Sequence, residues 1–164
     1  MHFFMLCCVA AWSQAASFQA AAAEPVRMAV FDFSLIDTSP APPTADEMAR
    51  LHRLGDQLRA ALAGHYAVLD AAPMQAKLDV TSIRGCNGCE LDVAQTLGAQ
   101  QVAYGWVQKV SNLILNINLV VEDAATGKRL RADSVDIRSN TDESWTRGLR
   151  YLLDERLYRD DPLH

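Results

Sequence analysis

The stretch QVAYGWVQKVSNLILNINLVVED, residues 101–123, decides the fold because it holds two alternating strands and one short turn. In its first half, Val102, Tyr104 and Trp106 share one face. In its second half, Leu113 to Asp123, the apolar residues occupy the odd positions and asparagines face the other way. Ser111-Asn112 separates the halves and predicts a two-residue hairpin turn. The stretch therefore predicts an antiparallel pair with one strongly apolar face.

Downstream, residues 128–138 predict a third strand, reached through a hairpin loop that ends at Gly127. Its apolar phase changes from even to odd positions, which indicates a β-bulge near Asp133-Ser134. Asn140-x-x-Glu143 has the spacing of a capping box for a last helix. The expected buried stripe of that helix is Trp145, Leu149, Leu152, Leu153 and Leu157.

Upstream, residues 27–33 form a nearly continuous apolar run, typical of a strand buried on both faces. Ser34 to Thr44 contains Pro40, Pro42 and Pro43, and we expect a loop there. Helical spacing follows, with a stripe of Met48, Leu51, Leu54, Leu58 and Leu62.

Further segments complete the predicted order: a strand at residues 66–70, a helical turn from Pro73, and a helix from Cys89 to Leu97 that Gly98 ends. The order is β-α-β-α-β-β-β-α. It predicts an α/β (α+β mixed) fold with a mixed sheet flanked by helices. The carboxyl-terminal strands of this sheet form an antiparallel meander.

The first 23 residues read as an export signal. An apolar stretch is followed by small residues, and Ala21-x-Ala23 before Glu24 has the form of a signal-peptidase site. An uncleaved membrane anchor is the alternative, since about 20 residues can span a bilayer. We expect residues 1–23 to be removed, leaving residues 24–164 as a single α/β domain, periplasmic or secreted, with no membrane span. Cys7 and Cys8 would leave with the leader.

The formal net charge is −5, and the leader contributes none of it. A mildly acidic domain lacks the electrostatic footprint that binding to nucleic acid or to an anionic membrane requires. We therefore expect no nucleic-acid partner.

Cys86-Asn87-Gly88-Cys89 is the main chemical motif. In an oxidising compartment a C-x-x-C pair predicts a closed disulfide. Thiol–disulfide exchange is the alternative, because a helix amino-terminus stabilises a thiolate, although nearby carboxylates oppose it. Zinc needs about four ligands, so His52 or His65 would have to join from afar. Covalent haem attachment is excluded in its usual form, because Glu90 follows Cys89 where a histidine is required.

Four carboxylates are candidates for a ligand or partner loop: Asp32, Asp37, Glu90 and Asp92. Asp32 and Asp37 lie at or after the carboxyl end of the first strand, where open α/β sheets tend to bind ligands. Capping and loop solvation is the plainer interpretation. No calcium loop, phosphate loop or G-x-S-x-G nucleophile motif is present. The sequence thus predicts no catalytic, cofactor-binding or metal residues.

Taken together, several fold-level motifs resemble a known group of envelope proteins. They are a first strand ending in Asp-Phe, Ala94-x-x-Leu97-Gly98-Ala99 running into Val102-x-Tyr104-Gly105-x-Val107, and a meander closing on Asp123-x-x-Thr126-Gly127. The pattern is similar to the amino-terminal domain of TolB and to the periplasmic domain of curli-secretion channel subunits. It resembles more closely a family of small secreted bacterial proteins without an assigned function. The resemblance implies work through protein–protein contacts in the bacterial envelope and carries over no catalytic residue.

The resulting hypothesis is an exported accessory or binding protein that acts on an envelope partner without catalysis. The sheet edge and the Ser34–Thr44 segment are the expected contact surfaces. Tyr104, Trp106 and Trp145 are expected in the core, and Tyr104 or Trp106 becomes a partner-binding anchor if it faces outward. The alternatives are a thiol–disulfide redox accessory and a small-ligand or metal-binding module.

Overall fold

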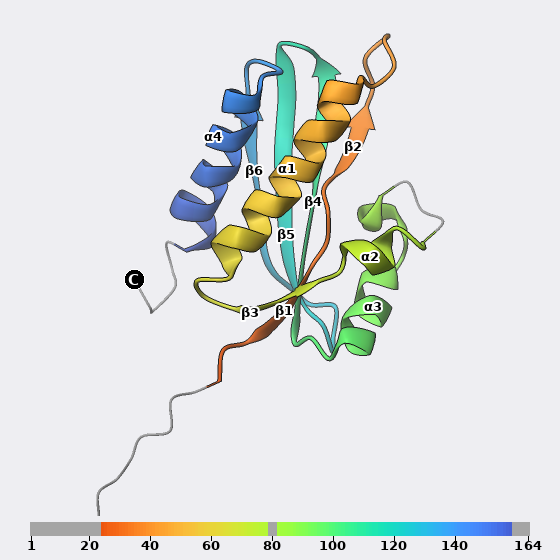
Figure 1. Cartoon of the computed structure of the whole chain (residues 1–164), viewed down its shortest axis with the longest axis vertical. Coiled ribbons are helices and arrows are strands. Elements are labelled where there is room, and N and C mark those ends of the chain that lie inside the picture. Colours follow the sequence, from red (N-terminus) through yellow and green to blue (C-terminus); the bar gives the residue numbers. More distant parts are fainter. Residues whose placement is uncertain (1–23, 79–81, 159–164) are drawn as a thin grey trace, which may run out of the picture.

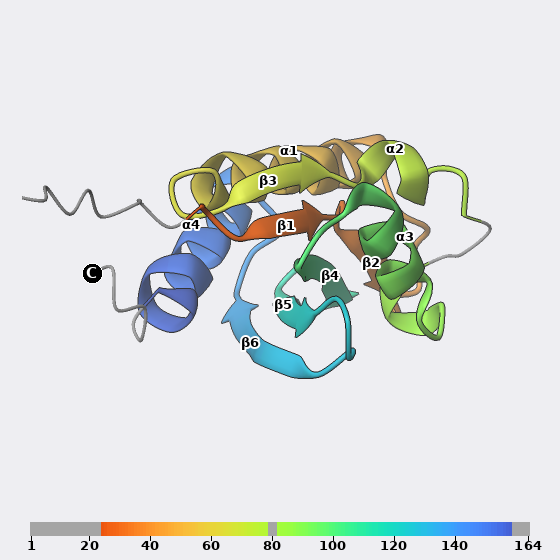
Figure 2. The same cartoon turned by 90° about the horizontal axis from the view of Figure 1, so that it is seen from below.

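The structure is a computed structural model that describes residues 24–78 and 82–158, so the leader lies outside the described residues. Its strands are β1 (Arg27–Val30), β2 (Ser34–Asp37), β3 (Ala67–Asp70), β4 (Gln101–Ser111), β5 (Ile114–Asp123) and β6 (Arg129–Ile137). Its helices are α1 (Ala45–Leu62), α2 (Ala72–Gln75), α3 (Cys89–Leu97) and α4 (Asp142–Leu152), with a 3-10 turn η1 (Ile83–Gly85) and a π-turn η2 (Leu153–Leu157). Figures 1 and 2 show them around a single sheet.

The sheet is six-stranded and mixed, in the order β3-β1-β4-β5-β6, with β2 also paired to β4. β1 runs parallel to β3 and β4, whereas β4, β5 and β6 form the antiparallel meander. The predicted fold class is confirmed.

Strand β2 corrects the expectation that Ser34 to Thr44 is entirely loop. Ser34 to Asp37 pair in parallel with Trp106 to Lys109, so β1 and β2 follow one another along the same neighbour strand. The prolines lie beyond this pairing, in the segment that leads to α1. The strand is only four residues long, and the prolines that follow it made the whole segment look like a loop in the sequence.

Helices α1 and α4 cover one face of the sheet (Figure 1). Leu51, Leu54, Leu58 and Leu62 of α1 are buried as predicted, whereas Met48 is 45% exposed. Thr44 caps α1 through a capping box with Glu47. All five predicted stripe residues after Asn140 are buried.

The amino-terminus of α4 differs from the prediction. Thr141 is the N-cap and Ser144 its capping-box partner, in place of Asn140 and Glu143. Asn140 instead accepts a hydrogen bond from the Trp145 indole and donates one to Glu47, so it joins α4 to α1.

Helices α2 and α3 and the turn η1 cover part of the opposite face (Figure 2). Their core contains Phe31, Ile83, Val93 and Val102, all buried. Helix α3 has the predicted bounds and ends at Gly98, whose φ of 68° is left-handed.

The meander deviates from the prediction by small shifts in register. The β4–β5 turn consists of Asn112 and Leu113, because Ser111 pairs with Ile114. The β6 irregularity lies at Leu130, between the pairs Val121–Arg131 and Glu122–Arg129, and not at Asp133-Ser134. One extra residue at Leu130 accounts for the change of apolar phase along β6.

Candidate functional site

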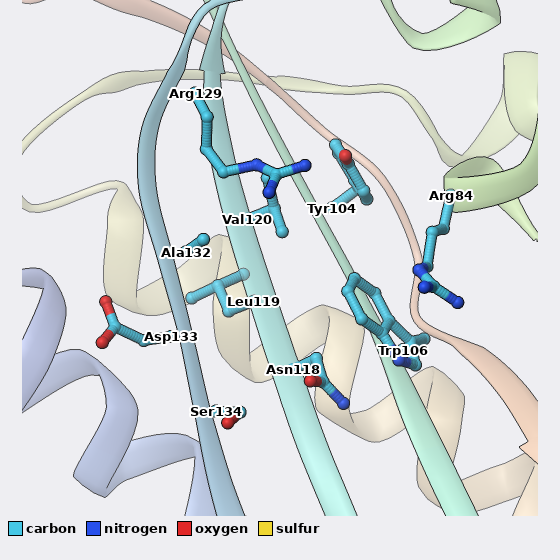
Figure 3. Close-up of a pocket in the computed structure, with 10 residues that line it drawn as sticks. All are labelled: Arg84, Tyr104, Trp106, Asn118, Leu119, Val120, Arg129, Ala132, Asp133 and Ser134. Atoms are coloured by element: carbon cyan, nitrogen blue, oxygen red, sulfur yellow. The ribbon is translucent and has the colours of Figure 1, made fainter. Parts of the chain in front are cut away.

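The face of the sheet that carries α3 is only half covered, and the open half contains a groove of about 260 Å³. Strands β4, β5 and β6 form its floor, and η1 forms one wall (Figure 3). The lining residues are Arg84, Tyr104, Trp106, Asn118, Leu119, Val120, Arg129, Ala132, Asp133 and Ser134. Figure 3 shows the Asp133 carboxylate pointing to the far side of β6 from Trp106, so this charge does not enter the groove.

Cross-strand register explains the shape of the groove. Trp106 pairs with Asn118, which pairs with Ser134, and this row crosses all three strands. In the adjacent row Val120 lies between Tyr104 and Ala132. The small side chains on β6 leave a hollow beside the large Trp106, which is half-buried.

Two arginines border the groove. The Arg84 guanidinium carbon lies 5.0 Å from the centre of the Trp106 ring, within the range of a cation–π contact. Within the described residues, no carboxylate forms an ion pair with Arg84. The Arg129 Nε atom lies 3.7 Å from Glu122 Oε1, which is beyond hydrogen-bond distance. Arg129 is exposed, so its donors remain available to a ligand.

Tyr104 and Glu122 form a buried pair at the end of the groove near Arg129. The Tyr104 hydroxyl donates to Glu122 Oε1 at 3.0 Å. Burial first, and then the Glu122 carboxylate, raise the pKa of Tyr104 to about 12, so the phenol keeps its proton at neutral pH. The Tyr104 hydroxyl therefore stays a hydrogen-bond donor, and Glu122 Oε1 is its acceptor.

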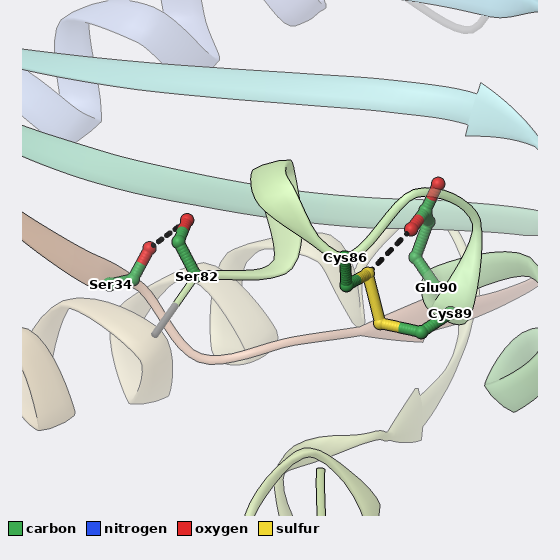
Figure 4. The surroundings of a disulfide bond; sticks show 5 residues. All are labelled: Ser34, Ser82, Cys86, Cys89 and Glu90. Atoms are coloured by element: carbon green, nitrogen blue, oxygen red, sulfur yellow. Dashed lines mark hydrogen bonds between the residues drawn. A yellow bond between two sulfur atoms is a disulfide. The ribbon is translucent and has the colours of Figure 1, made fainter. Parts of the chain in front are cut away.

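The disulfide between Cys86 and Cys89 is present and closes the loop between η1 and α3 (Figure 4). Asn87 and Gly88 have φ of 56° and 107°, the left-handed conformations that such a tight loop requires. Cys86 Sγ lies 3.1 Å from Glu90 Oε2. A disulfide sulfur has no proton to donate, so this is a close contact and not a thiol hydrogen bond.

Two further contacts hold η1 in place. The Ser82 hydroxyl hydrogen-bonds that of Ser34 at 2.9 Å, which links the start of η1 to β2 (Figure 4). Ile83 is 2% exposed and packs in the core beneath α3. Arg84 follows Ile83 directly and precedes the disulfide by two residues, so these anchors fix the backbone that presents Arg84 to Trp106.

The cysteines meet only part of what a metal site needs. Within the described residues, Cys86, Cys89 and Glu90 are grouped closely enough to hold an ion, but both sulfurs are consumed by the disulfide. Neither histidine considered as a further ligand is among them. His52 lies 3.7 Å from Asp32, and His65 stacks on Tyr158 at 4.3 Å. The residues present do not fit a four-ligand zinc site.

The structure separates the four candidate carboxylates. Asp32 accepts a hydrogen bond from Arg59 at 2.8 Å, and Asp37 accepts one from Lys109 at 3.1 Å. Glu90 adjoins the disulfide, and Asp92 is exposed on the first turn of α3. Among the described residues these four carboxylates share no hydrogen-bond or ion-pair partner, and their role as a ligand or partner loop stays a prediction.

Lys109 forms the centre of a buried ion cluster that sequence reasoning missed. Its Nζ lies 2.7 Å from Glu47 Oε1 and 3.1 Å from Asp37 Oδ2, and the three side chains are 4%, 1% and 7% exposed. Burial opposes ionisation of both carboxylates, but hydrogen bonds outweigh it and lower the pKa of Asp37 and of Glu47. The bond to Glu47 raises the pKa of Lys109. The ion pairs of Lys109 connect its strand β4 to β2 through Asp37 and to α1 through Glu47.

Of the three aromatics expected in the core, Tyr104 and Trp145 are buried. Trp106 is half-buried and faces the groove, which matches the condition for a binding anchor. Arg84 and Arg129 were not recognised as site residues from the sequence. The signal that points to Arg129 is its position at the start of the last meander strand, after Gly127-Lys128, but Arg84 has no local signal.

Residues 26–157 match the DUF3280 family, which is described as "Protein of unknown function (DUF2380)". The resemblance to a family without an assigned function is thereby confirmed. No curated protein matches the chain. In the described parts of the chain, every helix is too short or too polar to cross a membrane.

Solved structures match the fold at low sequence identity. Lipoprotein GNA1162 from Neisseria meningitidis has a TM-score of 0.53 and 16% identity, over 83% of this chain and 99% of that one. The PelC dodecamer from Paraburkholderia phytofirmans has a TM-score of 0.50 and 17% identity, over 81% and 88%. TolB from Acinetobacter baumannii matches with a TM-score of 0.43 and 9% identity, over 81% and 29%.

Proposed function

The chain belongs to the DUF3280 family of proteins of unknown function, and we propose that it is an exported envelope protein that acts by binding a protein partner, without catalysis. The observation that carries this proposal is the open half of the sheet face. There a half-buried tryptophan lies between an arginine and a hollow floor. Tryptophan and arginine are the residues most enriched among those that dominate binding energy at protein interfaces.

The other charged groups support binding rather than chemistry. Lys109 pairs with both Glu47 and Asp37 in a buried cluster, and Asp32 is held by Arg59. Groups held in this way are poorly placed to transfer protons to a substrate. In the groove, in contrast, Arg84 and Arg129 are exposed to solvent.

Export through residues 1–23, with cleavage before Glu24, is part of the proposal. The apolar leader and its Ala21-x-Ala23 site support it. Among proteins with a similar fold, one is described as a lipoprotein and another was solved as a dodecamer, which fits a domain that works through its surfaces in the envelope. Fractionation and mass analysis test export: a chain that stays cytoplasmic and keeps residues 1–23 would overturn this part.

Site-directed photo-crosslinking in the host tests the binding surface. A photoreactive residue replaces Ser134, which is exposed on β6 in the groove. The control carries it at Glu143, which is exposed on α4. We expect a discrete adduct from position 134 that is lost when Trp106→Ala is added, and no such adduct from position 143. Equal adducts from both positions, or none from position 134, would overturn the proposal.

A further inference from the structure

We propose that the groove recognises an acidic peptide segment of the partner, with its carboxylates on Arg84 and Arg129 and an apolar side chain on Trp106. This inference rests on the proposed function and specifies the chemistry of the partner.

The groove contains several donors that are not used within the described residues. Arg84 contacts a ring and no carboxylate among the described residues, and Arg129 lies 3.7 Å from the carboxylate beside it. The side-chain nitrogen of Asn118 is buried without a hydrogen-bond partner in the part of the chain that the structure describes. Glu122, the carboxylate beside Arg129, already receives the Tyr104 hydroxyl. A ligand that supplies acceptors would therefore pair the unused donors.

Charge favours carboxylates among such acceptors. Arginine pairs with carboxylates through parallel hydrogen bonds, and this geometry gives specificity as well as affinity. Arg84 and Arg129 bring two positive charges to the groove, Glu122 offsets one of them, and Asp133 points away (Figure 3). The Glu90 carboxylate also acts on Tyr104, so the positive charge without a carboxylate partner among the described residues is that of Arg84, beside Trp106.

The dimensions favour a short stretch of peptide over a small molecule. Pockets for small molecules are usually enclosed, largely apolar and ~300–1,000 Å³ in volume. This groove is open, contains about 260 Å³, and has polar side chains beside the apolar Trp106, Leu119, Val120 and Ala132. The backbone groups of β5 are paired on both sides within the sheet, whereas β6 is an edge strand that pairs with β5 alone. A ligand over the middle of the floor is therefore held through side chains.

The disulfide contributes to this site through Arg84. Because Ile83 and the Cys86–Cys89 loop fix the η1 backbone, Arg84 is held over Trp106 before any ligand arrives. Preorganisation of this kind lowers the entropy lost on binding. Reduction of the disulfide should therefore weaken peptide binding even where the domain remains folded.

Fluorescence anisotropy with the full chain, purified as the host exports it, provides the test. The probe is a fluorescein-labelled peptide Gly-Glu-Leu-Glu-Leu-Glu-Gly, and the control probe replaces each Glu with Gln. We expect the Gln peptide to bind at least tenfold more weakly, and binding of the Glu peptide to weaken with added salt. Equal binding of both peptides would overturn the proposal.

Variants locate the bound peptide. Arg84→Gln and Arg129→Gln should each weaken binding about three- to tenfold, and Trp106→Ala about tenfold or more. Arg147→Gln, which removes an exposed arginine from α4, is the matched control and should leave binding unchanged. An equal loss in all the variants would mean non-specific attraction and would overturn the site.

Other occupants of the groove would give different results. If a second copy of this chain fills it, light scattering will show an oligomer that Trp106→Ala dissociates, and the acidic peptide will not bind. If the photoreactive residue at position 134 captures a partner but no acidic peptide competes with it, the partner-binding function stands and this inference fails.

Discussion

Replacing Lys109 by methionine should destabilise the protein by about 3 kcal/mol at pH 7. The ammonium group lies 2.7 Å from Glu47 and 3.1 Å from Asp37, and all three side chains are at most 7% exposed. Removing one partner of a buried ion pair costs ~3–5 kcal/mol, because the remaining charge stays desolvated. The lower end applies here because each carboxylate keeps other donors: Thr44 and Asn140 for Glu47, and the backbone of Ser39 for Asp37.

The measurement is urea unfolding followed by circular dichroism. Domains of this kind unfold with ~5–15 kcal/mol, so the variant should still fold. With a slope of about 2 kcal/mol per molar urea, a loss of about 3 kcal/mol lowers the midpoint by about 1.5 M. Lys128→Met makes the same change at an exposed lysine and should alter stability by no more than about 0.5 kcal/mol.

The pH dependence gives a second, independent criterion. The pKa values of Asp37 and Glu47 are lowered in the folded protein, so their contribution is complete above the unfolded pKa of about 4 and is lost as pH falls through the folded values. The pKa of Lys109 is raised, so its contribution is lost only as pH rises through a folded value above about 10.

The difference between Lys109→Met and the parent should therefore be largest at neutral and higher pH and should shrink as pH falls, because protonation of the desolvated carboxylates in the variant removes the uncompensated charge. Adding Glu47→Gln to the variant should recover part of the lost stability. A loss under about 1 kcal/mol at pH 7, or a loss that stays the same down to pH 3, would refute the assignment of a buried, charged cluster.

Three more substitutions test local features of the fold. Gly105→Ala should cost about 1–3 kcal/mol in thermal unfolding, because a Cβ there would overlap the ring of Phe33; unchanged stability would contradict this packing. Gly88→Ala should cost about 1 kcal/mol or more because φ is 107°, and equal stability of the two proteins would refute the loop conformation. Replacing both Cys86 and Cys89 by alanine should cost about 2 kcal/mol, the small value that a short closed loop implies, and a loss above about 4 kcal/mol would argue for a larger role.

Local sequence patterns predicted the secondary structure well where the residues that begin and end an element lie within or beside it. Helix α3 begins at Cys89 and ends before Gly98 because the loop glycine and the left-handed glycine lie in the sequence itself. Strand β2 was missed because its pairing with β4, about 70 residues away, stabilises four residues that have little strand character of their own. The bulge at Leu130 was displaced for a similar reason, since only the partner strand fixes the register.

The site was harder to predict because its residues come from different segments. The alternation along β4 placed Tyr104 and Trp106 on one face, as the structure does. The alternation could not show that the cover provided by α3 and η1 ends between Tyr104 and Trp106. Lys109 falls on the inward phase of the same strand, with Val107, and a lysine at such a position is a signal of a buried ion pair. The partners of that lysine, in β2 and α1, are set by the tertiary fold.

The lengths of the covering helices explain why one face of the sheet closes and the other stays open. Strand β4 has 11 residues and extends about 36 Å, and α1 has 18 residues and extends about 27 Å across the closed face. Helix α3 has only 9 residues, about 13 Å, so it cannot cover the full strand on the other face. Burial along β4 follows this limit: Val102 is 0% exposed and Tyr104 6%, Trp106 is half-buried, and Gln108 is exposed.

A tryptophan at the point where cover ends needs a partner on its free face. Within the chain, Arg84 supplies that partner from η1, the last element before the disulfide and α3. The disulfide therefore acts at the boundary between core and binding face, where a shift of η1 would expose the Trp106 ring. In protein that lacks residues 1–23, and with them Trp12, and that carries Trp145→Phe, reduction should shift the fluorescence of Trp106 to longer wavelength without loss of helix signal. An unchanged spectrum would show that Arg84 stays over the Trp106 ring without the Cys86–Cys89 disulfide.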